Sequence, residues 1–139
     1  TLKITNDRLS SCGINKIIEK KCSHEIKSIC KQLKKSVNED ADIILIFGTS
    51  AISDINDTIP QSIIQINGTI LRLGMPVEPG NLILLADIKI SKKNISIIGM
   101  PGCARSKKEN GVDWILWRKL CDLKISSDDI NHMGNGGLL

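Results

Sequence analysis

Residues 42–48 read Asp-Ile-Ile-Leu-Ile-Phe-Gly, a continuous apolar run that ends at a glycine. A strand that is buried on both faces of a parallel sheet has this pattern, because helices cover both of its sides. The run therefore predicts a strand over residues 42–47 that is buried on both faces. The loop that follows, from Gly48 to Asp57, would then lie at the carboxyl end of that strand.

Apolar residues recur at helical spacing on both sides of this strand. Upstream, the spacing predicts helices over 2–9 and 24–36, with Ser23 as the N-cap of the second and a short strand over 14–18 between them. Downstream, the sequence Asp57-Thr58-Ile59-Pro60 predicts a helix start, because proline is accepted in a first turn. We expect the Asp57 side chain to accept hydrogen bonds from the first-turn amides of that helix.

The second half of the chain predicts three more strands and a helix. Residues 69–73 form one strand, and the runs 82–90 and 95–100 flank a polar turn, which predicts a β-hairpin near 82–100. A helix over about 106–121 follows the turn at Pro101-Gly102. Alternating strands and helices predict the α/β class, as a three-layer α/β/α domain with a mostly parallel sheet.

The length fits one domain over residues 1–139. Because the first residue is Thr1 and not methionine, we expect this domain to be a fragment of a longer protein. The five cysteines are odd in number and form no C-x-x-C pair, which favours a reducing, cytoplasmic location. No apolar run approaches the roughly 20 residues that span a bilayer, so we expect no membrane partner.

The formal net charge of +4 is modest, and its lysines are spaced as on solvated helix faces. Proteins that bind single-stranded nucleic acid interleave basic residues with stacking aromatic side chains. This chain has one phenylalanine, two tryptophans and no tyrosine. We therefore expect no nucleic-acid partner.

The loop after the first buried strand contains Gly48, Thr49 and Ser50. A glycine there lets the backbone approach a ligand closely and direct N–H groups at an anion, although a simple strand terminator explains these residues equally well. Asp54 and Asp57 follow in the same loop. Their carboxylates could hold a hydrated Mg²⁺ beside a bound phosphate, which also makes them the candidate catalytic residues.

A second candidate loop, Pro101-Gly102-Cys103-Ala104-Arg105-Ser106, leads into the predicted helix at 106–121. Ligands in open α/β sheets bind at the carboxyl ends of the strands, so we expect this loop and the loop at 48–57 to share one edge. Three cations, Arg105, Lys107 and Lys108, would crowd a helix N-terminus that disfavours positive charge, and a bound phosphate would relieve this repulsion. Cys103 is expected to be a packing residue, and His24 and His132 are expected to have no role.

Three segments of the chain resemble the MoaB/Mog superfamily of molybdopterin-binding domains, which includes domains of MoeA, gephyrin and the CinA proteins. They are the strand and loop at 46–50 with the helix start at 57–60, the Pro-Gly turn within 74–81, and the Pro-Gly loop that opens 101–114. The likeness is strongest to a subgroup with Gly-Met-Pro-Val-x-Pro-Gly-Asn, Pro-Gly-Cys-Ala-Arg-Ser-x-Lys-x-Asn-Gly-x-Asp-Trp and a Gly-Gly-Leu-Leu terminus. It covers residues 48–139.

The resemblance implies a MoaB/Mog-like fold and a phosphate-binding site that holds molybdopterin or the molybdenum cofactor, within bacterial molybdenum cofactor biosynthesis. It also implies a MobA-like nucleotidyltransferase partner, fused or separate, and a homo-oligomer. The cofactor-binding residues that it implies are Gly48, Thr49, Ser50, Gly80, Asn81, Pro101, Gly102, Cys103, Ala104, Arg105, Ser106 and Lys108.

Two other functions compete with ligand binding. One is an enzyme that adenylylates or otherwise nucleotidylates molybdopterin with ATP or CTP and Mg²⁺, which Asp54 and Asp57 would position. The other is a non-catalytic domain for oligomerisation or docking. The loop at 48–50 lacks two glycines of the Mog-type loop, which favours binding over catalysis.

Overall fold

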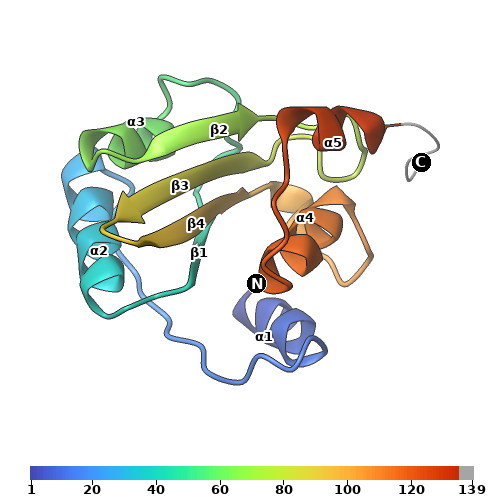
Figure 1. Cartoon of the computed structure of the whole chain (residues 1–139), viewed down its shortest axis with the longest axis horizontal. Helices are drawn as coiled ribbons and strands as arrows, with labels where there is room; N and C mark the ends of the chain where they lie inside the picture. Colours follow the sequence, from blue (N-terminus) through green and yellow to red (C-terminus); the bar gives the residue numbers. More distant parts are fainter. Residues whose placement is uncertain (135–139) are drawn as a thin grey trace.

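A four-stranded sheet forms the centre of the computed structural model, which describes residues 1–134 (Figure 1). The strand order across the sheet is β1-β4-β3-β2. The strands are β1 (Ile43–Phe47), β2 (Thr69–Leu73), β3 (Leu84–Ile90) and β4 (Lys93–Met100). The chain is thus of the predicted α/β class.

The sheet is mixed, and the prediction of a mostly parallel sheet is wrong. Only β1 and β4 run parallel, whereas β3 is antiparallel to both β4 and β2. A parallel connection needs a crossover of about a dozen residues or more. The segment 74–83 between β2 and β3 is shorter than that, and β3 turns directly into β4 through Ser91 and Lys92. The predicted hairpin near 82–100 is confirmed.

Helices cover both faces of the sheet, so the predicted three layers are present (Figure 1). On one face lie α2 (Ile26–Asn38) and α3 (Thr58–Gln65). On the other lie α1 (Leu2–Ser10), α4 (Gly111–Leu120) and α5 (Ser127–His132). None of the helices in the described part of the chain is long and apolar enough to cross a bilayer.

Each face has its own apolar core, because successive side chains of a strand point to opposite sides. In β3, Leu84, Ala86 and Ile88 pack against α2 and α3, whereas Leu85 packs against the helices of the other face. The helical residues of the first core are Ile29, Leu33, Ile59 and Ile63. Those of the second core are Leu9, Val112, Ile115, Leu116 and Ile130.

Three predicted elements differ from the structure. Residues 14–18 form no strand: Ile14 and Ile17 pack onto the second core as irregular chain, and Ile18 is 60% exposed. The helix expected at 24–36 begins at Ile26, with Glu25 rather than Ser23 at the N-cap position. The helix expected from 106 begins only at Gly111, after a 3₁₀ turn, η1 (Gly102–Arg105). The Gly-Gly-Leu-Leu sequence at 136–139 lies outside the described residues.

Candidate functional site

The two candidate loops leave the sheet side by side. Phe47, the last residue of β1, pairs with Met100, the last residue of β4, and the two strands are parallel. The prediction that the loops at 48–57 and 101–106 share one edge is therefore confirmed. Arg105 joins them: its Nη2 donates to the carbonyl of Gly48 at 2.7 Å, and its guanidinium lies 5.7 Å from the centroid of the Phe47 ring.

The loop after β1 contains one buried residue, Ile52, and a stretch of exposed residues before it. Ile52 is 2% exposed and packs over Gly99 of β4, where an added Cβ would lie only 2.6 Å from the Ile52 side chain. The preceding residues, from Thr49 to Ala51, are exposed. Within residues 1–134, their backbone N–H groups donate no hydrogen bond. Such unpaired N–H groups in a loop are suited to an anion.

Gly48 begins this loop and has no room for a side chain. An added Cβ would lie 2.9 Å from Cδ1 of Ile59 and 3.0 Å from the carbonyl oxygen of Ser50. Glycine at this position therefore allows the chain to leave β1 directly over the start of α3.

Asp57 occupies the N-cap position of α3, but its side chain does not cap the helix. Its carboxylate instead accepts from the backbone N–H groups of Ser53 at 2.8 Å and Asp54 at 3.0 Å. The predicted capping bond is therefore wrong, because the loop itself brings two donors to the same oxygen. These hydrogen bonds hold the pKa of Asp57 below its usual value.

The Asp54 carboxylate also stabilises the loop. It accepts from the backbone N–H of Asn56 at 2.7 Å and from the side-chain amide of Asn56 at 2.8 Å. Among residues 1–134, no three His, Cys, Asp or Glu side chains are grouped as metal ligands. A hydrated Mg²⁺ takes one or two carboxylates, so Asp54 and Asp57 are the residues that could hold it here.

Gly102 opens the second loop with an exposed Cα. An added Cβ would meet no atom within 4 Å, and Gly102 is not among the residues with positive φ. Behind it, Ala104 is fully buried. Burial, followed by the negative charge of Glu78, raises the pKa of the Cys103 thiol, so this thiol stays protonated at neutral pH.

The expected helix N-terminus behind Arg105 is not present. The helix starts at Gly111, and its first turn is already capped: Asn110 Oδ1 accepts from the N–H of Val112, and Asp113 Oδ2 accepts from the N–H of Asn110. Arg105, Lys107 and Lys108 therefore do not crowd a helix dipole. They are exposed cations at the end of η1 and in the bend that follows it, so no repulsion from a helix dipole calls for a bound phosphate.

Gly80 and Asn81 belong to a turn that packs against the beginning of α4. Gly80 has a φ of +126°, and an added Cβ would lie 2.8 Å from the backbone nitrogen of Gly111. The Gly111 N–H donates to the carbonyl of Pro79 at 2.8 Å. The backbone of Gly80 lowers the pKa of the Cys103 thiol, an effect that burial outweighs. The turn thus lies behind η1.

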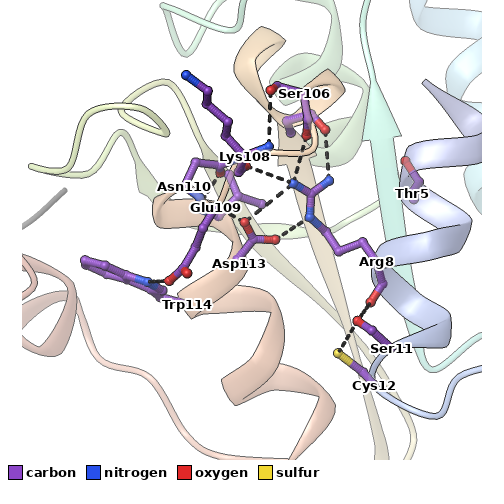
Figure 2. Close-up of polar contacts among 12 residues, drawn as sticks. Thr5, Arg8, Ser11, Cys12, Ser106, Lys108, Glu109, Asn110, Asp113 and Trp114 are labelled. Atoms are coloured by element: carbon purple, nitrogen blue, oxygen red, sulfur yellow. Dashed lines mark hydrogen bonds and ion pairs between the residues drawn. The ribbon is translucent and has the colours of Figure 1, made fainter. Parts of the chain in front are cut away.

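Arg8 is a residue of this region that the sequence did not reveal (Figure 2). Its side chain is 9% exposed and forms an ion pair with Asp113, which is 4% exposed. Its Nη1 donates to the carbonyl of Ala104 at 3.0 Å, and its Nη2 to that of Ser106 at 3.1 Å. No local pattern links positions 8 and 113, which are 105 residues apart in the chain.

His24 also lies closer to the site than expected. Its Cε1 is 3.5 Å from the position that a Cβ on Gly48 would take, and its charge contributes to the lowered pKa of Asp57. The start of α2 brings it to this loop. His132 lies on α5, where its Nδ1 contacts the carbonyl of Asp128.

In comparisons with known proteins, no family model matches the chain and no curated protein matches it. What the two loops can bind therefore follows from their geometry and from the resemblance of their sequences.

Proposed function

We propose that this domain binds molybdopterin or the molybdenum cofactor, and that it acts in molybdenum cofactor biosynthesis. One observation carries the proposal: two loops that resemble those of molybdopterin-binding domains lie side by side at one sheet edge, joined by Arg105 and Gly48. The edge offers unpaired N–H groups from Thr49 to Ala51 within the described residues. It also offers an exposed Cα at Gly102.

These features fit the terminal phosphate of molybdopterin. Backbone N–H groups and the Ser50 hydroxyl would donate to its oxygens, and Arg105 and Lys108 would supply positive charge. The missing side chain at Gly102 would let the ligand approach the backbone closely. A ligand held there by its phosphate would be a substrate for a MobA-like nucleotidyltransferase, on the same chain or a separate one.

Two observations favour binding over nucleotidyl transfer by this domain. The loop at 48–50 lacks glycines of the Mog-type loop. In addition, the carboxylates of Asp54 and Asp57 already accept hydrogen bonds within their own loop. Release of pyrophosphate from ATP and Mg²⁺ on addition of molybdopterin would reverse this assignment.

Titration of molybdopterin into wild-type protein and into Gly102→Val protein tests the proposal. The added side chain would project into open space, so the domain should fold normally and lose affinity. Lys3→Ala, an exposed change on α1, is the matched control and should bind as wild type does. Equal affinity of the Gly102→Val and wild-type proteins would place the ligand elsewhere.

A further inference from the structure

Arg8 holds the back of the loop at 104–108. The carbonyl oxygens of Ala104, Ser106 and Lys108 all accept from its guanidinium, at 3.0, 3.1 and 3.5 Å. The same group forms the ion pair with Asp113 (Figure 2). One side chain of α1 thus contacts three alternate residues of the loop and the first turn of α4.

This arrangement fixes which way the loop's peptide groups face. In a trans peptide the C=O and the following N–H point in opposite directions. Because the carbonyls of Ala104, Ser106 and Lys108 point at Arg8, the N–H groups of Arg105 and Lys107 point away from it. The guanidinium also neutralises the partial negative charge of these carbonyls, which would otherwise repel an approaching anion.

We propose that Arg8 is a positioning residue for anion binding: it acts through the loop at 104–108 and does not itself touch the ligand. The inference rests on the proposed function, because it assigns Arg8 a role at that same site. It explains why Arg105 can reach Gly48, since the loop that carries Arg105 is held from behind.

The geometry requires an arginine. A guanidinium presents five N–H donors in a planar fork, so it can serve a carboxylate and several carbonyls at once. A lysine would keep the charge opposite Asp113, but its single ammonium could not reach the same set of carbonyls. Arg8→Lys therefore tests the two roles separately, because it keeps the ion pair with Asp113 and loses the hydrogen bonds to the loop carbonyls.

The chain carries a reporter of the loop's conformation. Trp114 donates from its indole Nε1 to Glu109 Oε1 at 2.8 Å, and Glu109 directly follows the residues that Arg8 binds. The only other tryptophan, Trp117, is 40% exposed and lies one turn further along α4. An NMR spectrum of the indole N–H groups should therefore contain one signal that senses the loop and one internal control.

The experiment compares wild type, Arg8→Lys and the double variant Arg8→Met/Asp113→Asn, with Lys3→Ala as control. The double variant leaves no unpaired buried charge, and the amide introduced at position 113 keeps a carbonyl oxygen for the Asn110 N–H, so it protects the test against unfolding. In the ligand-free proteins, we expect the Trp114 signal to shift in both Arg8 variants while Trp117 stays unchanged. Affinity for molybdopterin should fall between about twofold and thirtyfold.

The outcomes are distinguishable. If wild type binds molybdopterin and both Arg8 variants bind equally well with an unchanged Trp114 signal, the role of Arg8 is overturned and the proposed function stands. A shifted Trp114 signal with full affinity also overturns the role, because the loop then moves without consequence. If wild type does not bind molybdopterin, the proposed function fails, and the role of Arg8 in anion binding fails with it.

Discussion

Two glycines of the candidate site, Gly102 and Gly80, differ in the atoms that an added side chain would contact. At Gly102 a Cβ would enter open space, whereas at Gly80 it would collide with the backbone of Gly111. Gly80 also has a φ of +126°, which residues with a side chain rarely adopt. Space for a ligand can therefore explain the glycine at 102, while the packing of the turn explains the one at 80.

Gly102→Ala should leave the stability of the domain unchanged or raise it by up to about 1 kcal/mol, because the unfolded chain loses freedom and nothing clashes. Gly80→Ala should lower stability by about 1–3 kcal/mol through strain. Urea unfolding measures both. Equal stability losses in the two variants would contradict the assignment of open space at Gly102.

Arg105→Ala should weaken molybdopterin binding by about 1.5–3 kcal/mol, the value of a charge-assisted hydrogen bond. It should also destabilise the empty domain by about 1 kcal/mol, since Arg105 donates to Gly48 and covers Phe47. The sequence alone predicted no such cost, because it placed Arg105 at a crowded helix start. Lys107→Ala removes a neighbouring exposed cation and is the control. Calorimetry measures the affinity of each variant for molybdopterin, and thermal unfolding measures its stability.

At the scale of elements, the starts of α3 and α4 show how much a sequence pattern can predict. The apolar run before Gly48 and the Asp-x-x-Pro start of α3 are local signals, and both elements form where they indicate. The expected burial of the first strand is wrong, because β1 lies at the edge of the sheet and its residues are only partly buried. The start of α4 depends on a distant residue: Arg8 binds the carbonyls of 104–108, which a helix would need for its own hydrogen bonds. Residues 106–110 are all polar, so no apolar pattern marks where the helix begins, and the sequence placed its start too early.

Two further departures, the strand expected at 14–18 and the mostly parallel sheet, also depend on distant parts of the chain. Residues 14–18 have the composition of a strand, but a strand forms only where another strand supplies hydrogen bonds, and composition does not reveal the partner. The direction of β3 depends on the lengths of its connections to β2 and β4. Of the site, the sequence predicted both loops and their common edge, but not the contributions of Arg8 and His24, which come from other elements.

Arg8→Ala should cost about 3–5 kcal/mol, because it leaves the buried Asp113 without its counter-charge. The double variant Arg8→Met/Asp113→Asn should recover most of this loss, since it removes both charges. Chemical denaturation of the single and double variants forms the test. A double variant as unstable as Arg8→Ala would show that the carbonyl contacts, and not the ion pair, hold α1 in place.

At the scale of the whole molecule, carboxylates with lowered pKa values make the fold sensitive to acid. Hydrogen bonds and charges lower the pKa values of Glu39, Asp40, Asp57 and Asp129. A group whose folded pKa is depressed contributes stability above its unfolded pKa and loses it as the pH falls through the folded value. The domain should therefore lose stability below about pH 4, where unfolded carboxylates begin to protonate.

Asp57 allows this expectation to be tested at one residue. Asp57→Asn should lower stability at pH 7, because a neutral amide oxygen is a weaker acceptor for the N–H groups of Ser53 and Asp54. The difference from wild type should shrink as the pH falls below the ordinary carboxyl pKa of about 4, since wild-type Asp57 protonates as the pH passes its lower folded pKa. Urea midpoints over this pH range measure it, with Asp7→Asn as an exposed control. A difference that is constant with pH would contradict the assignment.

The contact of Ile52 with Gly99 has a consequence for protein engineering. The loop at 48–57 is not a detachable module, because its anchor needs a position on the neighbouring strand β4 where no Cβ stands. A designer who grafts this loop onto another α/β scaffold must also transfer a glycine at the matching register of the neighbouring strand. Without that glycine, the graft would carry the exposed residues 49–51 and still present them in the wrong shape.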